Sequence, residues 1–385
     1  MKKVLILGGS HRDIPIIQAS KELGYYVITL ANAKDYLGHS YAHQSYEVDF
    51  NDKEAVKKII KKENIVYILP GCGEESYLRC VELSDELKLS NLDKPQTAEL
   101  LHNKLSFKNF CSKHKISTPQ KYTLSSNTQS LNFPLVVKPT NLSGGRGVEI
   151  VYTEDSLMKA LNNAKKYSNE VFLEEFIDGE LIAYSLFIKN KKVIYGFSGK
   201  DESFINPYIV TTAYPYDISK HTLFHLQSTM EKIATTLNLV DGMFHLQAII
   251  KNDIPYIIDI TRRIPGDLYP FLIEKCDGVS YSKAVVKSYI GKEITDEFQP
   301  KHQSKFVIRH VAMSKNNGTY SHLFIDKKIQ RYISYRVDLL QDGSLIDDYL
   351  HTQIAIIFLE LPTVDTEILK NLNKLIYPVF KETNR

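Results

Sequence analysis

Residues 244–250 read Phe-His-Leu-Gln-Ala-Ile-Ile, residues 251–253 read Lys-Asn-Asp, and residues 256–263 read Tyr-Ile-Ile-Asp-Ile-Thr-Arg-Arg. Two apolar, β-rich runs that flank a short polar turn predict a β-hairpin. A turn centred on Asp253 places Gln247 opposite Asp259, because the numbers of paired residues in a hairpin have a constant sum. The same register places His245 opposite Thr261.

One face of the predicted hairpin is polar. Alternate residues of a strand share a face, so the members of each face can be read from the sequence. The polar face holds His245, Gln247, Asp259, Thr261 and Arg263, and the other face holds Leu246, Ile258 and Ile260. Polar groups are costly to bury unless they contact a ligand, a metal or water. The stripe therefore favours a binding site, with a solvent-exposed sheet face as the alternative.

Upstream of the hairpin, residues 171–180 read Val-Phe-Leu-Glu-Glu-Phe-Ile-Asp-Gly-Glu, an apolar strand that runs directly into acids. The backbone groups of an extended segment between two lobes can hold an adenine, and a carboxylate further along can accept hydrogen bonds from ribose hydroxyls. The alternative is a set of solvated acids at the end of a strand.

Further upstream, residues 138–148 read Lys-Pro-Thr-Asn-Leu-Ser-Gly-Gly-Arg-Gly-Val between two predicted strands. Glycines remove the side chains that keep backbone N–H groups away from an anion. Lys138 adds a positive charge, and a hydrogen bond to a charged group contributes ~1.5–3 kcal/mol. The segment predicts a flexible loop over phosphate groups, with an ordinary glycine-rich hairpin as the alternative.

The first part of the chain alternates strands and helices. Strands are predicted over residues 3–7, 26–30 and 65–69, and helices over residues 15–23, 53–63 and 75–87. This alternation predicts a parallel sheet with helical crossovers, so we expect a small doubly wound α/β domain over residues 1–95. Gly8 and Gly9 do not begin a dinucleotide fingerprint, because Ser10 and Asp13 stand where further glycines are required.

The rest of the chain predicts an α+β arrangement. Short strands between residues 135 and 260 are separated by turns or helices, and a smaller set of strands is followed by a helix from Thr366 to about Tyr377. We therefore expect a two-lobed central domain over residues 96–297 and a small α+β cap over residues 298–385.

The composition excludes several classes of protein. The 385 residues are 43% hydrophobic and 24% charged, and no run approaches the ~18–20 apolar residues that span a bilayer. A net charge of +3 is too small for the basic face of a nucleic-acid-binding protein. The four cysteines lack the spacing of a zinc site and are too few for a disulfide scaffold. We therefore expect a cytoplasmic protein that binds neither membranes nor nucleic acids.

Taken in order, these segments resemble the ATP-grasp superfamily, which includes biotin carboxylase, carbamoyl phosphate synthetase, glycinamide ribonucleotide synthetase and D-alanine ligase. The resemblance covers nearly the whole chain. It implies an ATP clamped between two lobes, with its phosphates on two lysines and under the glycine-rich loop, its adenine on the segment after residue 173, and its ribose on a later acid. The residues implied to bind ATP are Lys104, Lys138, Ser143, Gly144, Gly145, Gly147, Glu174, Glu175, Ile177 and Glu180.

The resemblance also makes the polar stripe a magnesium site. The family pattern has two acids twelve residues apart, an asparagine two residues after the second acid, and then an arginine. The corresponding residues are Gln247, Asp259, Thr261 and Arg263. Since Gln247 supplies a neutral carbonyl, a second anion is lacking unless Asp267 turns in. We therefore expect weak metal binding in the absence of nucleotide.

Arg263 is the implied catalytic residue, because a guanidinium can bind the transferring phosphoryl group or a substrate carboxylate through two hydrogen bonds. The residues implied to bind substrate are Glu74, Arg263, Gly266 and Asp267. For Glu74 the alternative is an acid in the first turn of a helix, where the helix dipole favours a negative charge.

The activity that the resemblance implies is ATP-dependent ligation of a carboxylate to an amine through an acyl phosphate, with ATP and Mg²⁺ as cofactors and a small amino-acid-like or sugar-linked substrate. The alternatives are a bicarbonate-dependent enzyme of the carboxylase type, a nucleotide-binding protein with little or no catalysis, and a dehydrogenase. A homodimer is expected by analogy of fold alone.

Overall fold

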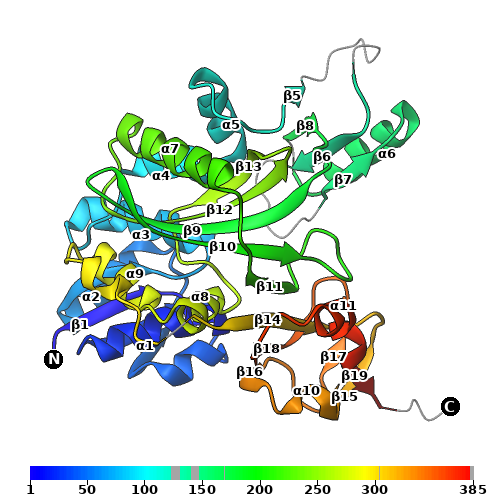
Figure 1. The fold of residues 1–385 in the computed structure, drawn as a ribbon. Helices are drawn as coiled ribbons and strands as arrows, with labels where there is room; N and C mark the ends of the chain where they lie inside the picture. Colours follow the sequence, from blue (N-terminus) through cyan, green and yellow to red (C-terminus); the bar gives the residue numbers. More distant parts are fainter. Residues whose placement is uncertain (123–130, 140–146, 169, 303, 382–385) are drawn as a thin grey trace.

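The computed structural model describes residues 1–122, 131–139, 147–168, 170–302 and 304–381, and it begins with a parallel sheet in the order β3-β2-β1-β4 (Figure 1). The strands are β1 (Lys3–Leu7), β2 (Tyr26–Ala31), β3 (Gln44–Glu47) and β4 (Ile65–Pro70), and the helices are α1 (Ile14–Glu22), α2 (Lys53–Glu63) and α3 (Glu74–Leu87). Val4 and Ile6 pack with α1, whereas Leu5 and Leu7 pack with α2 and α3. Helices therefore cover both faces, as the alternation in the sequence predicted.

Two short helices, α4 (Pro95–His102) and α5 (Lys104–Lys113), lead from this sheet to the central part of the chain. Asn103 ends α4 and begins α5, and its side chain accepts a hydrogen bond from the backbone N–H of Ser106 at 2.9 Å. Such a cap satisfies one of the free N–H groups at a helix start. It fixes where α5 begins and so where Lys104 lies.

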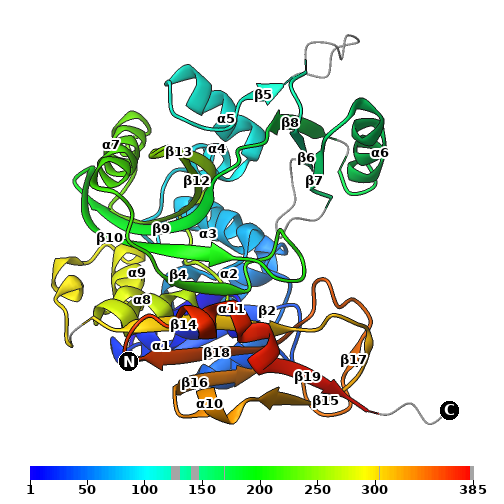
Figure 2. The same ribbon diagram turned by 45° about the vertical axis from the view of Figure 1, so that its right-hand side comes forward.

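The small lobe is an antiparallel sheet in the order β5-β8-β6-β7, covered by one helix. Its elements are β5 (Lys121–Tyr122), β6 (Leu135–Pro139), β7 (Glu149–Val151), α6 (Glu154–Ala164) and β8 (Val171–Glu175). Leu135, Val137 and Leu173 pack against Leu157 and Leu161 of α6. Figure 2 shows this lobe standing apart from the large sheet, to which strand β8 leads.

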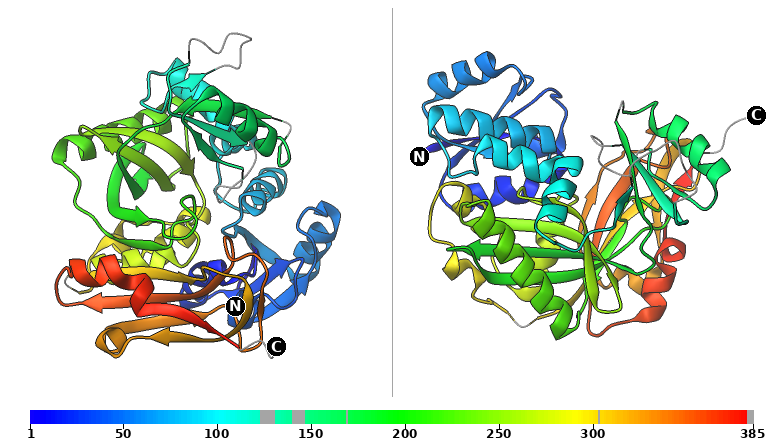
Figure 3. Two further views of the ribbon diagram at one scale, coloured as in Figure 1. Left: turned by 90° about the vertical axis from the view of Figure 1, so that its right-hand side faces the viewer. Right: turned by 90° about the horizontal axis from the view of Figure 1, so that it is seen from above.

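The large sheet has eight strands in the order β13-β12-β9-β10-β11-β14-β18-β16. The strands are β9 (Glu180–Lys189), β10 (Lys192–Glu202), β11 (Thr212–Pro215), β12 (Gly242–Lys251), β13 (Ile254–Thr261), β14 (Phe306–Met313), β16 (Ile333–Asp338) and β18 (Gln353–Leu361). Helix α7 (Lys220–Thr236) covers one face, and α8 (Tyr269–Asp277) and α9 (Tyr281–Tyr289) cover the other (Figure 3).

The last part of the chain adds a second layer beneath β14 and β18. It contains β15 (Gly318–Ile325), α10 (Lys327–Gln330), β17 (Leu345–Ile346), α11 (Thr366–Leu375) and β19 (Ile376–Phe380). The predicted helix over 366–377 is too long, because the chain leaves α11 at Leu375 and Tyr377 lies in β19, paired with Phe324. The large sheet includes strands on both sides of residue 298, and the boundaries 1–95, 96–297 and 298–385 stay predictions.

The hairpin of β12 and β13 has the register that the sequence predicted at its polar end. Gln247 lies opposite Asp259 and His245 lies opposite Thr261. The turn is tighter than expected, since Lys251 pairs directly with Ile254. A bulge between positions 247 and 248 restores the register, because a β-bulge sets two residues of one strand against one residue of its partner.

The bulge corrects one assignment on the apolar face. Leu246, Ile257 and Ile260 belong to the core under α7, whereas Ile258 is only partly buried. The assignment of Ile258 to the face of Leu246 and Ile260 was therefore wrong, because the bulge places Ile257 opposite Ala248 instead.

The four cysteines, Cys72, Cys80, Cys111 and Cys276, are buried free thiols. Within the described residues, no helix combines the length and the apolar character needed to cross a bilayer.

Candidate nucleotide and metal site

Lys138 and Glu174 meet on one face of the small lobe. Lys138 pairs with Phe172 across β6 and β8, and Val136 pairs with Glu174, so Lys138 and Glu174 are diagonal neighbours. The Lys138 ammonium contacts Glu174 Oε1, and Lys108 Nζ lies 2.9 Å from Glu174 Oε2. Burial alone would raise the pKa of Glu174, which is 1% exposed, but Lys138 and Lys108 hold it below its usual value.

Lys108 was not among the residues predicted from the sequence. It lies one helical turn after Lys104, so α5 presents both ammonium groups along one side. Burial lowers the pKa of Lys108, although Glu174 opposes that shift. The Glu174 carboxylate thus orients Lys138 and Lys108. Because it is occupied by these lysines, a base bound at this connector would contact the backbone of the segment rather than this side chain.

Gly147 is the described part of the glycine-rich loop, since Ser143, Gly144 and Gly145 lie outside the described residues. Its φ of +72° is unfavourable for a residue with a Cβ. An added Cβ would also lie 2.9 Å from Cγ of Pro139, which follows Lys138 in β6. Glycine is therefore required at this position for two separate reasons.

The connector between the lobes follows β8. The backbone N–H of Glu175 donates to Gln120, and Ile177 is 3% exposed. Glu180 begins β9 and is exposed, and its carboxylate accepts a hydrogen bond from Tyr216 Oη at 2.5 Å and lies 3.2 Å from Lys200 Nζ. The Tyr216 hydrogen bond lowers the pKa of Glu180.

The hairpin face offers oxygen atoms. Asp259 is exposed, its Oδ1 accepts from the backbone N–H of Ile260 at 3.0 Å, and Gln247 lies directly opposite on β12. Thr261 lies two residues further along β13, and its Oγ1 accepts from the backbone N–H of Arg263 at 3.2 Å. Among the described residues no cluster of three His, Cys, Asp or Glu side chains could hold a metal ion. One carboxylate with neutral oxygens fits Mg²⁺ in the way that nucleotide enzymes hold it, with phosphates and water completing the shell.

Glu74 and Arg263 approach the hairpin from two sides. Glu74 begins α3 at the carboxyl end of β4. Burial raises the pKa of Glu74, Arg263 and Lys104 lower it, and Asp259 raises it further. Lys104, Asp259 and Arg263 therefore lie within electrostatic range of Glu74. The buried Nε of Arg263 has no hydrogen-bond partner in the described structure.

Gly266 and Asp267 follow β13 and lie near the segment after β1. A Cβ added to Gly266 would lie 3.3 Å from Arg12 Cδ. The carboxylate of Asp267 accepts from Gln353 Nε2 at 3.1 Å and lies 3.8 Å from His11 Nε2. Burial alone would raise the pKa of Asp267, but His11 and the charges of Arg309 and Arg12 lower it to about 2. In this structure Asp267 faces Gln353 and His11, and the acid that contacts Gln247 is another residue.

That residue is Asp201, near the end of β10, which sequence analysis did not single out. Asp201 is 5% exposed, and its Oδ2 accepts from Gln247 Nε2 at 2.9 Å. Burial raises the pKa of Asp201 to about 6, against the opposing effects of Gln247 and Arg309. The sequence signal was weak, because Lys200 and Glu202 flank it and make the segment resemble an exposed strand end.

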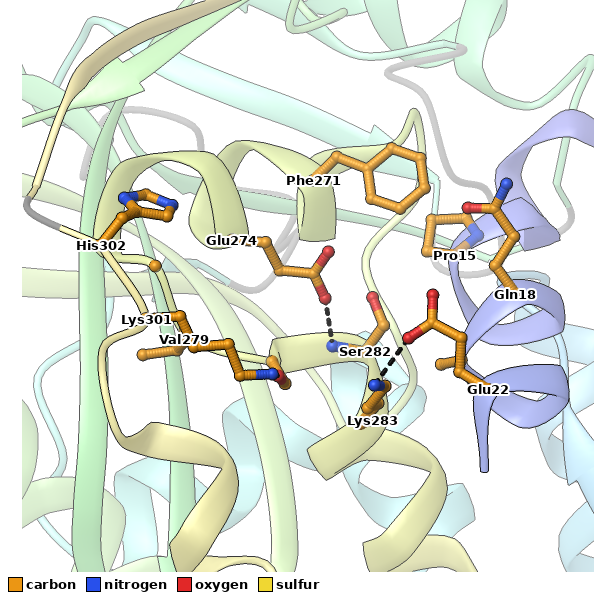
Figure 4. Close-up of a pocket in the computed structure, with 13 residues that line it drawn as sticks. Pro15, Gln18, Glu22, Phe271, Glu274, Val279, Ser282, Lys283, Lys301 and His302 are labelled. Atoms are coloured by element: carbon orange, nitrogen blue, oxygen red, sulfur yellow. Dashed lines mark hydrogen bonds and ion pairs between the residues drawn. The ribbon is translucent and has the colours of Figure 1, made fainter. Parts of the chain in front are cut away.

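A cavity of about 240 Å³ lies away from these residues, between α1, α8 and α9 (Figure 4). Glu274 and Ser282 point into it, and Lys283 pairs with Glu22 at its rim at 2.6 Å. None of the residues that the sequence predicted for ATP, metal or substrate lines this cavity.

A protein-family model agrees with the middle of the chain. Residues 101–239 match the model described as "D-ala D-ala ligase C-terminus". This range begins just before α5 and ends after α7, so it includes Lys104, Lys138 and the connector after β8.

Curated relatives are formate-dependent phosphoribosylglycinamide formyltransferases. The chain is 29% identical over 188 residues to the protein of Prochlorococcus marinus subsp. pastoris, covering 46% of this chain and 48% of the relative. It is 24% identical over 280 residues to the protein of Wolinella succinogenes, covering 68% of this chain and 70% of the relative. The chain thus spans about half the length of the first relative.

Solved structures share the whole fold. The L-amino acid ligase of Bacillus licheniformis has a TM-score of 0.84 at 16% identity, with 99% of each chain covered. Phosphoribosylglycinamide synthetase of Anaerococcus prevotii has a TM-score of 0.79 at 19% identity, with 99% of this chain and 100% of that chain covered.

A third structure contains nucleotide. The biotin carboxylase domain of Hydrogenobacter thermophilus 2-oxoglutarate carboxylase, in complex with MgADP and bicarbonate, has a TM-score of 0.74 at 17% identity and covers 98% of this chain and 90% of that chain. The expected fold class is confirmed, because these solved structures share the fold of nearly the whole chain, and the resemblance to ATP-grasp enzymes agrees with the family model over residues 101–239.

Proposed function

We propose that this chain is an ATP-dependent carboxylate–amine ligase that acts on a small amino-acid-like or sugar-linked substrate. The observation that carries the proposal is the register of the β12–β13 hairpin, in which Asp259 lies opposite Gln247 and Arg263 follows on the same strand end. Glu74 and Lys104 lie within electrostatic range of this face. A carboxylate, two cations and a second acid at one place suit a reaction between a triphosphate and a small acid.

The chemistry follows from the weakness of carboxylates as electrophiles. A carboxylate oxygen attacks the γ-phosphorus of ATP, the bond from that phosphorus to the β-phosphate oxygen breaks, and ADP leaves. The acyl phosphate is then attacked at its carbonyl carbon by an amine, phosphate leaves, and the amine nitrogen loses a proton. Phosphoryl transfer of this kind depends on positioning and on neutralising charge, so no nucleophilic side chain is required.

The role of each residue in this scheme follows from its charge or from the backbone groups that it offers. Lys138 and Lys104 bind phosphate oxygens, Ile177 presents backbone groups to the adenine, and Glu180 accepts from the ribose. Arg263, with its unpaired buried Nε, holds the substrate carboxylate or the transferring phosphoryl group.

Asp259, Gln247 and Thr261 would hold the magnesium ion. When bound there, the ion supplies positive charge against the phosphates. Glu74, Gly266 and Asp267 face the acceptor side. The buried thiols of the cysteines are compatible with the cytoplasmic location that we propose.

The proposal is tested by ATP-dependent phosphate release in the presence of Mg²⁺ and a panel of amino acids. Asp259→Asn removes the metal-binding charge, so substrate-dependent release should be abolished. Asp253→Asn is the matched control, because Asp253 lies in the turn of the same hairpin at a φ of +60° that asparagine tolerates well. Wild-type rates in Asp259→Asn would contradict the metal site.

Nucleotide affinity tests the small lobe separately. Lys138→Ala should weaken binding of a fluorescent ATP analogue by about 10- to 100-fold, which corresponds to the loss of one charge-assisted hydrogen bond. The fold should survive because Glu174 keeps Lys108 as a partner. Lys192→Ala is the control, since Lys192 is an exposed lysine that pairs with Glu231. Equal affinities of the two variants would count against the assignment of Lys138.

Two alternatives are decided by the same assay. The single acid on the hairpin favours a nucleotide-binding protein with little catalysis, which would bind ATP but release no phosphate with any substrate. A carboxylase-type enzyme would release phosphate when bicarbonate replaces the amino acids.

A further inference from the structure

The contact between Asp201 and Gln247 crosses an intervening strand. Gln247 on β12 lies opposite Ala183 on β9, and Ala183 lies opposite Gly199 on β10. Asp201 is two residues beyond Gly199 and therefore shares its face. Because Ala183 and Gly199 are small, the two polar side chains reach each other over them, and Asp201 Oδ2 accepts from Gln247 Nε2 at 2.9 Å.

This contact selects one orientation of the Gln247 amide. The two ends of an amide differ only in hydrogen bonding, since nitrogen donates and oxygen accepts. An ionised carboxylate can only accept, so Asp201 holds the nitrogen of Gln247 and leaves its Oε1 for another partner. Without Asp201, the amide could turn its nitrogen toward the hairpin face, where a cation could not bind it.

The remaining oxygen of Asp201 is also informative. Asp201 is 5% exposed, and its Oδ1 has no hydrogen-bond partner in the described part of the chain. A buried carboxylate oxygen without a hydrogen-bond partner lowers the stability of the folded protein. Asp201 is therefore a buried acid beside Gln247 for which the described residues provide a hydrogen-bond donor to only one of its two oxygens.

We infer that Asp201 is a positioning residue of the metal–nucleotide site, which keeps the oxygen of Gln247 directed to the cation and supplies the negative charge that position 247 lacks. This inference rests on the proposed function. The second acid of the site has moved from β12 to β10, two strands away, and acts through the amide of Gln247.

The arrangement makes positions 201 and 247 interdependent. Gln247→Glu restores the acid of the family pattern, but it places a second carboxylate beside the buried Asp201, at a partly buried position where like charges repel. Combining it with Asp201→Asn removes that repulsion, because the new amide can donate to the new carboxylate. The double variant exchanges the two groups between the strands.

The test measures binding of Mn²⁺ in the presence of ADP, by the loss of the electron paramagnetic resonance signal of free Mn²⁺. Asp201→Asn should weaken Mn²⁺ binding by about 10-fold or more, as is typical when a residue that orients a metal ligand is changed. Gln247→Glu alone should also weaken it and should lower the midpoint of urea unfolding. The exchange variant should recover most of the affinity and the wild-type midpoint.

Glu202→Gln is the matched control, because Glu202 is the exposed neighbour of Asp201 and bonds to Tyr214. The inference is overturned if Asp201→Asn binds Mn²⁺ as tightly as Glu202→Gln, or if the exchange variant binds no better than the weaker single variant. Should either single variant fail to fold, the exchange variant alone decides. Failure of the wild-type protein to bind Mn²⁺ with ADP would instead overturn the proposed function.

Discussion

Glu174 and Glu274 are both enclosed glutamates, and their surroundings give them opposite properties. Glu174 lies in the small lobe between Lys108 and Lys138, and these cations hold its pKa below the usual value in spite of burial. Glu274 lies in the cavity between α1, α8 and α9, where Oε1 accepts from the backbone N–H of Ser282 at 2.7 Å (Figure 4). Burial there raises its pKa to about 7.

The difference shows what a buried acid needs in order to stay ionised. Two lysines outweigh the desolvation of Glu174, whereas the hydrogen bonds from Ser282 and the charge of Lys283 do not outweigh that of Glu274. A buried carboxylate that is paired with cations stabilises the fold around a site, because removing it leaves the buried positive charges of its partners without a counter-charge. A carboxylate that is poorly paired responds to pH instead.

The largest effect is expected from Glu174→Ala. The variant leaves Lys108, which is 5% exposed, without its counter-charge, and breaking such a buried pair costs about 3–5 kcal/mol. The free energy of unfolding, measured with urea at pH 7, should fall by that amount. Glu175→Ala is the control, because the Glu175 carboxylate accepts one exposed hydrogen bond from the backbone of Gln120 at 3.3 Å, and its loss should stay below about 1 kcal/mol. Similar losses in the two variants would show that Lys108 does not depend on Glu174.

Glu174 and its two lysines also show which features of this region follow from the sequence. Glu174 was predicted in the adenine connector, directly after an apolar strand, and it lies near the end of β8. The two lysines on its carboxylate were not predicted, because that contact depends on how α5 packs against the small lobe. The spacing of four residues between Lys104 and Lys108 was the available signal.

The hairpin was predicted better because its register is a local property. Gln247 and Asp259 were paired correctly. The turn is tighter than predicted, which alone would shift the pairing by one residue, and the bulge shifts it back. A bulge has no reliable sequence signal here, so Ile258 was misplaced. Asp201 was missed because its burial requires the strand order β12-β9-β10, which no local pattern contains.

A smaller effect, with a distinct pH dependence, is expected from Glu274→Gln. The folded protein holds a proton on Glu274 up to about pH 7, whereas the unfolded chain releases it near pH 4.5. The wild-type free energy of unfolding should therefore fall, relative to that of Glu274→Gln, as pH rises from about 4.5 to about 7, and the difference should then stay constant. We expect about 1–3 kcal/mol between pH 5 and pH 8.

Urea unfolding of both proteins at the two pH values measures this difference, in which all other titrating groups cancel. The variant keeps an oxygen that can accept from Ser282, so the geometry of the cavity is preserved. Glu54→Gln is the control, because the side chain of Glu54 is 76% exposed, and it should follow the wild type at both pH values. A constant difference for Glu274→Gln would mean that Glu274 ionises normally.

The smallest effect sharpens the comparison at the rim of the same cavity. Lys283 pairs with Glu22 at 2.6 Å, and the side chain of Glu22 is 59% exposed. Exposed ion pairs contribute about 0–1 kcal/mol, so Lys283→Ala should change the free energy of unfolding by less than about 1 kcal/mol. The charge of Lys283 nevertheless lowers the pKa of Glu274. The variant should therefore move the pH dependence described for Glu274 to slightly higher pH, and an unchanged pH dependence or a shift to lower pH would show that the charge of Lys283 does not lower this pKa. Lys283 differs from Lys108 in burial. A lysine lowers the pKa of a neighbouring acid strongly only where water is excluded from both side chains.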